Sequence, residues 1–132
     1  MQTTILGVLE NGRTRAIEVP ADTRQSLSLI RGDVATVRLL CTYPTGEAVD
    51  FTVLSATVTL VAKRRSTDTQ PLSSITGTVV ATRGKGWADF AIPASATKNL
   101  QPGRVVYAVH VTTSTAADTV IPASPLLILA AP

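Results

Sequence analysis

Short segments in which apolar and polar residues alternate, broken by turn-forming residues, limit most strongly how this chain can fold. About seven such segments follow one another between residues 27 and 131, with turn signals roughly every eight to twelve residues. Successive side chains of a β-strand point to opposite faces, so the alternation indicates strands with one buried face. No segment shows a sustained helical period, and no βαβ spacing or internal repeat is present. The pattern therefore predicts one all-β domain, an antiparallel sandwich or barrel.

The bounds of several elements are predicted from the same pattern. Residues 34–43 alternate regularly and predict a strand. The run 51–63 predicts a second long strand with a bend or bulge near Ser55, where a polar residue interrupts the apolar positions. Residues 75–82 predict a further strand, and residues 93–99 predict a single helical turn.

The stretch from Leu100 to Val111 combines a tight turn with a central strand. Pro102 and Gly103 predict the turn, and the alternating residues that follow predict the strand. A tyrosine that follows a leucine and a turn in this way, here Tyr107, resembles the tyrosine corner of β-sandwiches. In such a corner the ring packs on the core and the hydroxyl bonds to upstream backbone. Leu100, Pro102, Gly103 and Tyr107 are therefore predicted to form a structural corner.

A separate hairpin is predicted at the amino-terminal end. Residues 3–9 and 13–19 read as two short strands, and Asn11 and Gly12 between them are a strong hairpin signal. So short a hairpin buries little on its own, so it either packs on the body of the domain or pairs with a neighbouring copy as an arm. The expected division is a hairpin or arm at 1–22 and a β-sandwich at 23–132.

Composition restricts the class of protein. Hydrophobic residues make up 45% of the chain and charged residues 16%, which argues against disorder. The net charge is +3, well below the level typical of nucleic-acid-binding domains. A single cysteine, Cys41, excludes a disulfide within the chain. Neither a signal-peptide pattern at the first residues nor an apolar run long enough for a membrane span is visible, so we expect synthesis and folding in a cytoplasm.

Basic residues and the tryptophan are the candidates for an interaction surface. If the basic residues lie together, they form a patch able to contact phosphate groups. No aromatic residues interleave with these basic residues for base stacking. A solvated sheet edge is the simpler interpretation. A sugar platform on the tryptophan is a further alternative. The candidate residues are Lys63, Arg64, Arg65, Arg83, Lys85 and Trp87.

The sequence contains too few residues able to act as nucleophiles, general bases or metal ligands for a catalytic or metal site. His110 is the only histidine, and with Cys41 it supplies too few partners for a triad or a zinc site. No pair of carboxylates is spaced across a predicted cleft. The tripeptide Arg31-Gly32-Asp33 matches an adhesion motif, but a turn in which Gly32 has an unusual φ is the simpler interpretation. The chain is therefore predicted to be non-enzymatic, with no cofactor and no metal.

From Ile30 onward, the order of strand and turn motifs resembles a known family. The motifs are Ile-Arg-Gly-Asp at 30–33, Pro-Thr-Gly-Glu-Ala-Val-Asp at 44–50, Gly-Thr-Val-Val at 77–80, Ala-Asp-Phe-Ala-Ile-Pro at 88–93, Leu-Gln-Pro-Gly at 100–103 and Tyr-Ala-Val-His-Val at 107–111. Together they resemble the immunoglobulin-like sandwich of bacteriophage virion proteins, especially the amino-terminal domain of baseplate upper proteins. The amino-terminal hairpin lies outside the resemblance.

The resemblance implies a structural part of a virus particle. Such a domain is present in several copies and docks on other virion proteins in a tail, a baseplate or a capsid shell, where it serves as an assembly, attachment or decoration module. A homo-oligomer is expected, because assemblies of one chain type are normally symmetric. The alternative that stays open is a stand-alone adhesion or carbohydrate-binding sandwich.

Overall fold

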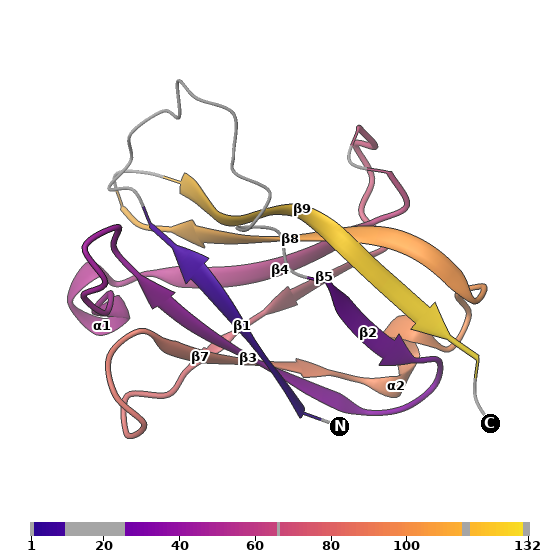
Figure 1. The fold of residues 1–132 in the computed structure, drawn as a ribbon, viewed down its shortest axis with the longest axis horizontal. Coiled ribbons are helices and arrows are strands. Elements are labelled where there is room, and N and C mark those ends of the chain that lie inside the picture. Colours follow the sequence, from indigo (N-terminus) through magenta and orange to yellow (C-terminus); the bar gives the residue numbers. More distant parts are fainter. Residues whose placement is uncertain (1, 10–25, 66, 115–116, 131–132) are drawn as a thin grey trace.

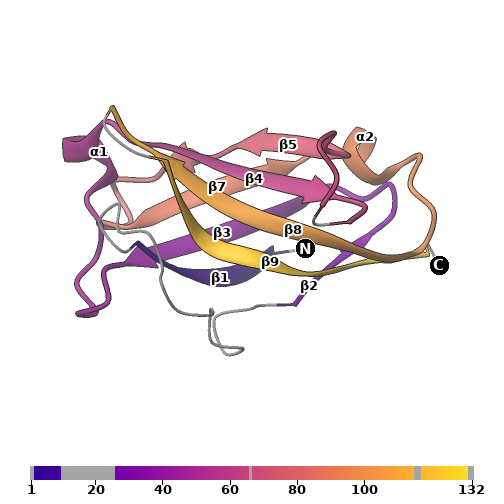
Figure 2. The same cartoon turned by 90° about the horizontal axis from the view of Figure 1, so that it is seen from above.

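The computed structural model describes residues 2–9, 26–65, 67–114 and 117–130, which form two β-sheets packed face to face (Figure 1). Sheet A contains, in spatial order, β1 (Gln2–Val8), β3 (Ala35–Thr42), β7 (Trp87–Ile92) and β6 (Thr78–Val79). Sheet B contains, in spatial order, β2 (Leu27–Ile30), β9 (Ala117–Leu129), β8 (Gly103–Thr112), β4 (Thr57–Lys63) and β5 (Ser73–Thr76). Two single-turn helices, α1 (Phe51–Leu54) and α2 (Ala94–Thr97), lie at opposite ends of the sandwich (Figure 2). The predicted all-β sandwich is confirmed.

Strand direction differs from the prediction at one edge of each sheet. β1 pairs with β3 in parallel, and β2 pairs with β9 in parallel, so both sheets are mixed rather than antiparallel. The remaining pairings in the described part of the chain are antiparallel. Parallel neighbours need a crossover connection. The chain meets this need by placing β2 in sheet B between β1 and β3 of sheet A.

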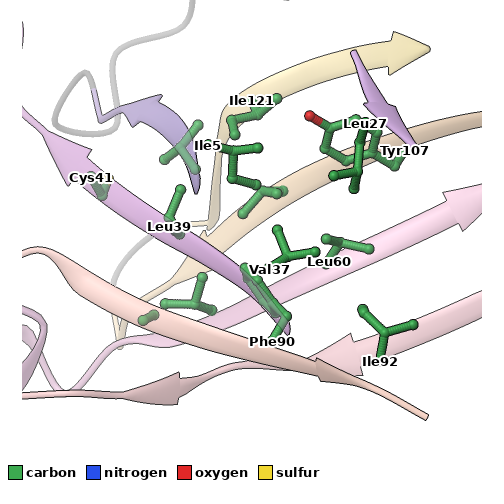
Figure 3. Packing of buried hydrophobic residues seen from close by; sticks show 14 of the residues in the cluster. Ile5, Leu27, Val37, Leu39, Cys41, Leu60, Phe90, Ile92, Tyr107 and Ile121 are labelled. Atoms are coloured by element: carbon green, nitrogen blue, oxygen red, sulfur yellow. The ribbon is translucent and has the colours of Figure 1, made fainter. Parts of the chain in front are cut away.

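A continuous apolar core fills the space between the two sheets (Figure 3). In β3 the burial alternates residue by residue, so that Val37, Leu39 and Cys41 point inward. In β8 the inward positions include Tyr107 and Val109. Inward side chains from both sheets thus meet in one layer, as expected for two sheets packed face to face. The central strands are held by burial on one face and hydrogen-bonded neighbours on both sides.

The first strand belongs to the sandwich. Ile5 is 1% exposed and Leu9 is 3% exposed, and the backbone N–H of Leu9 donates to the carbonyl of Thr42 at 2.8 Å. Residues 2–8 therefore form a strand of sheet A, and their apolar side chains complete the core beside β3. The predicted return strand at 13–19 and the predicted boundary at residue 22 lie outside the described residues.

The predicted long strand over 51–63 is wrong in its first part. Asp50 caps the short helix α1: its carboxylate accepts from the backbone N–H groups of Thr52 at 3.1 Å and Val53 at 3.2 Å. Ser55 ends the helix with a φ of 50°, and β4 starts only at Thr57. The aspartate offers the backbone a helix cap that competes with extension. The bend expected near Ser55 is therefore a helix end.

The chain changes sheets at Gly77, where the sequence predicted one strand over 75–82. β5 ends at Thr76 in sheet B and β6 begins at Thr78 in sheet A. A Cβ on residue 77 would lie 2.9 Å from a ring carbon of Phe90, so only glycine allows the backbone to approach the ring this closely. The helical turn expected over 93–99 is confirmed as α2.

Candidate interaction surface

The four residues of the predicted corner lie where the chain enters β8. Gly103 begins the strand with a φ of 150°, Pro102 before it is exposed, and Leu100 is half-buried against the core. Tyr107 is 1% exposed on the inner face of sheet B, and burial raises the pKa of its phenol because the charged form is disfavoured away from water. The corner itself stays a prediction, which a substitution can test.

Replacing Tyr107 by phenylalanine is expected to lower the free energy of unfolding by about 1 kcal/mol. Among the described residues no buried side-chain nitrogen or oxygen lacks a hydrogen-bond partner, so loss of this hydroxyl would remove a bond. The measurement is the urea midpoint. Tyr43→Phe at the half-buried tyrosine is the matched control and should change the midpoint less. An unchanged midpoint for Tyr107→Phe would argue against the corner.

The predicted basic residues do not form one patch. Lys63 ends β4, and the exposed Arg64 and Arg65 follow it. Arg83 and Lys85 lie in the turn that leads into β7. Figures 1 and 2 place the end of β4 and the start of β7 at opposite ends of the sandwich. The two basic groups are therefore separate surfaces.

Trp87 lies on the outer face of sheet A, in a row of apolar side chains. Leu6 pairs with Leu40 across β1 and β3, and Leu40 pairs with Trp87 across β3 and β7. Side chains of directly paired residues stand side by side on one face of a sheet. Leu6 is 58% exposed, and Leu40 and Trp87 are half-buried. This row crosses three strands and presents apolar surface to the outside.

A charged cluster lies next to the apolar row. Arg83 donates two hydrogen bonds to the carboxylate of Asp89, at 2.7 Å and 3.1 Å, and Arg38 lies 3.9 Å from the same carboxylate. The guanidinium carbon of Arg83 also lies 5.4 Å from the centre of the Trp87 ring. Asp89 therefore holds Arg83 in a cation–π position over the tryptophan. We call these six residues the Trp87 face: Leu6, Arg38, Leu40, Arg83, Trp87 and Asp89.

The ion pair positions side chains more than it stabilises the fold. The hydrogen bonds from Arg83 lower the pKa of Asp89, and the nearby charges of Arg83 and Arg38 act in the same direction against partial burial. Asp89 therefore stays ionised to a lower pH than a free aspartate does. Ion pairs this exposed to water contribute little to folding free energy. Here the two hydrogen bonds to Asp89 hold the guanidinium of Arg83 against the ring of Trp87.

Cys41 and His110, the two residues considered for catalysis or metal binding, do not form a common site. Cys41 is fully buried on the inner face of sheet A, and burial raises the pKa of its thiol to about 12. His110 is half-buried on β8, on the side opposite the inward Val109 and Val111. Within the described ranges, no group of three histidine, cysteine, aspartate or glutamate residues could hold a metal ion. Sequence reasoning found Trp87 and Arg83 but did not assign Asp89 to this surface, and it missed Arg38, which the pairing of β3 with β7 brings next to Asp89.

Comparisons with known proteins give a structural likeness only. No family model matches the sequence, and no curated protein matches it. Among solved structures, the chain is similar to the N-terminal domain of phage TP901-1 ORF48, with a TM-score of 0.47 and 7% sequence identity. The match covers 98% of this chain and 99% of that one. In the described part of the chain, no helix has the length and hydropathy needed to cross a membrane.

Proposed function

We propose that this chain is a non-enzymatic structural module of a bacteriophage particle that docks on other virion proteins through the Trp87 face. The order of motifs from Ile30 to Val111, which resembles phage virion sandwiches, suggests the class of particle. The place in the particle is a tail, a baseplate or a capsid shell, where the chain serves assembly or attachment. Its partners are other virion proteins and further copies of itself.

The Trp87 face is the observation that carries this proposal. Tryptophan and arginine are the residues most enriched among those that dominate binding energy at protein interfaces. Here both are fixed before binding, because Asp89 holds Arg83 against the ring. Side chains already ordered in the free protein lose less entropy on association. The apolar row with Leu40 and Leu6 extends the contact area across three strands.

The same geometry argues against Trp87 as a sugar platform. A sugar ring stacks on an open aromatic face, but the guanidinium of Arg83 already lies over the ring of Trp87. A glycan would have to displace a guanidinium that makes two bonds to Asp89. A protein partner can instead use the stacked pair as it stands.

Trp87→Ala is expected to reduce incorporation of the chain into particles by at least about tenfold, as for the loss of an interface hot spot. The measurement is the amount of this chain in purified particles, with particle shape followed by electron microscopy. Val53→Ala, on α1 at a side chain that is 77% exposed, is the control. Normal incorporation of Trp87→Ala, or glycan binding that requires Trp87, would contradict the proposal.

A further inference from the structure

A groove crosses the outer face of sheet B, opposite the Trp87 face. Its volume is about 210 Å³. The pairing of β8 with β9 shifts register between Tyr107 and His110, which interrupts the regular spacing of side chains beside the groove. The small side chains of Ala108 and Ala123 leave room in it. The lining residues that matter here are Val61, Lys63, Val106, Ala108, His110 and Thr119.

Besides Tyr107, which is buried on the inner face of sheet B, the titratable side chains that line the groove are the basic Lys63 and His110. Lys63 lies at one end, and His110 lies beside Thr119, with its Nδ1 3.0 Å from the threonine Oγ1. Burial lowers the pKa of His110, and the charge of Lys63 lowers it further. Val61 and Val106 add apolar surface to the lining, and Val106 lies directly beside Lys63. An occupant that suits the groove therefore carries a carboxylate next to a branched apolar side chain.

The turn between β2 and β3 of this same chain carries that pair of groups. Val34 is 69% exposed, and Asp33 beside it is exposed. Within the described ranges, the Asp33 carboxylate makes no hydrogen bond or ion pair. Gly32 has the predicted unusual φ, at 82°. Carboxylate and valine thus project together from the turn.

Backbone and side-chain bonds hold the turn in place. The N–H of Gly32 donates to the Thr97 hydroxyl at 2.9 Å, and the N–H of Arg31 donates to the carbonyl of Leu129 at 2.9 Å. Leu129 ends β9, whereas the groove lies beside residues 119–123 of that strand. At the rise of a β-strand, Leu129 is about 20 Å from Ala123, the nearest residue of β9 that lines the groove. A turn anchored in this way is held away from Thr119 and Ala123 of its own groove.

We propose that the β2–β3 turn of one copy docks in the sheet B groove of the next copy. Asp33 then faces Lys63 and His110, and Val34 packs on Val61 and Val106. The contact is heterologous, so it joins copies head to tail and produces a ring where the rotation closes. This inference rests on the proposed assembly role and adds the surfaces through which copies meet.

Charge reversal tests the contact by sedimentation equilibrium of the whole chain. Asp33→Lys and Lys63→Glu should each raise the dissociation constant for self-association by about tenfold or more, because each places like charges together. The double variant Asp33→Lys/Lys63→Glu restores opposite charges and should recover self-association. Val34→Ser should weaken it through loss of apolar contact. All the altered side chains lie at the surface, and thermal melting verifies that each variant is folded.

Matched controls make the same charge changes elsewhere. Glu47→Lys and Arg65→Glu alter exposed residues outside the groove and the turn, and they should leave the dissociation constant unchanged. A wild-type chain that stays monomeric at all concentrations would overturn the inference, and so would single variants that associate like the wild type. Binding of an acidic peptide that depends on Lys63, with Asp33 irrelevant to self-association, would assign the groove to another protein.

Failure of this inference is distinguishable from failure of the proposed function. Loss of particle incorporation in Trp87→Ala, with self-association of Asp33→Lys unchanged, leaves the assembly role standing and removes the turn-in-groove contact. Normal incorporation of Trp87→Ala, with self-association lost in Asp33→Lys, removes the proposed docking through the Trp87 face and leaves the contact between the β2–β3 turn and the groove standing.

Discussion

Gly86→Ala is expected to destabilise the sandwich by about 3 kcal/mol or more. Two independent effects, backbone strain and a steric clash, lower the free energy of unfolding at this position. Gly86 has a φ of 84°, which strains any residue that carries a Cβ. A Cβ there would also lie 2.5 Å from the carbonyl oxygen of Cys41, which is backbone and cannot rotate away. Relief of the clash would disturb the 2.8 Å bond from the Cys41 N–H to the Gly86 carbonyl, which ties the turn to β3.

Gly46→Ala is the matched control for this prediction. Gly46 has a similar φ of 90°, but a Cβ there would meet nothing within 4 Å. Its replacement should therefore cost only the conformational term, about 1 kcal/mol. Thermal or urea unfolding measures both variants. Equal losses of stability would show that the close approach to Cys41 contributes nothing, and the packing argument would fail.

The alternating pattern predicted β3 of sheet A and β8 of sheet B, which lie in the middle of their sheets. β3 was placed within a residue or two, because it buries one face and leaves the other partly exposed along its whole length. The turn and strand from Leu100 onward were placed for the same reason. Period-two patterning is a property of single strands, so it shows in the sequence wherever burial is one-sided.

Strand pairing and short helices were not predictable in this way. The parallel pairing of β1 with β3 depends on the chain passing through sheet B before it returns to sheet A, and the residues of the two strands do not indicate this path. The segment Phe51–Leu54 has residues that suit a strand, and its helix depends on the cap supplied by Asp50 and the left-handed Ser55. Local hydrogen bonds to the backbone outweighed a weak preference for extension there.

Only two members of the Trp87 face were predicted from the sequence as interaction residues. Trp87 and Arg83 were singled out from the sequence, and the structure places the guanidinium over the ring. Lys63 was grouped with them, but it lies at the far end of the other sheet. Neighbours on a sheet face are set by register between strands distant in the chain. The positions of Arg38 and Leu40 beside Asp89 and Trp87 therefore became visible only in three dimensions.

Phe90→Ala is expected to lower the free energy of unfolding by about 3–5 kcal/mol. Phe90 is fully buried on β7, opposite Val37 of β3 (Figure 3), and a Cβ on Gly77 would lie against its ring. Removing the ring leaves a cavity that rigid strands on both sides cannot close. Phe90→Leu keeps most of the volume and should cost about 1 kcal/mol. Denaturant unfolding at neutral pH measures both.

A double-mutant cycle isolates the contact between Phe90 and the sheet-crossing glycine. In the wild-type background, Gly77→Ala should cost about 1–3 kcal/mol, because its Cβ would lie 2.9 Å from a ring carbon of Phe90. In the Phe90→Leu background that ring carbon is absent, so the same substitution should cost less, with a coupling energy of about 1 kcal/mol. Additive losses would mean that Gly77 is required for its backbone conformation alone. Coupling would show instead that the passage from sheet B to sheet A is closed by the ring of Phe90.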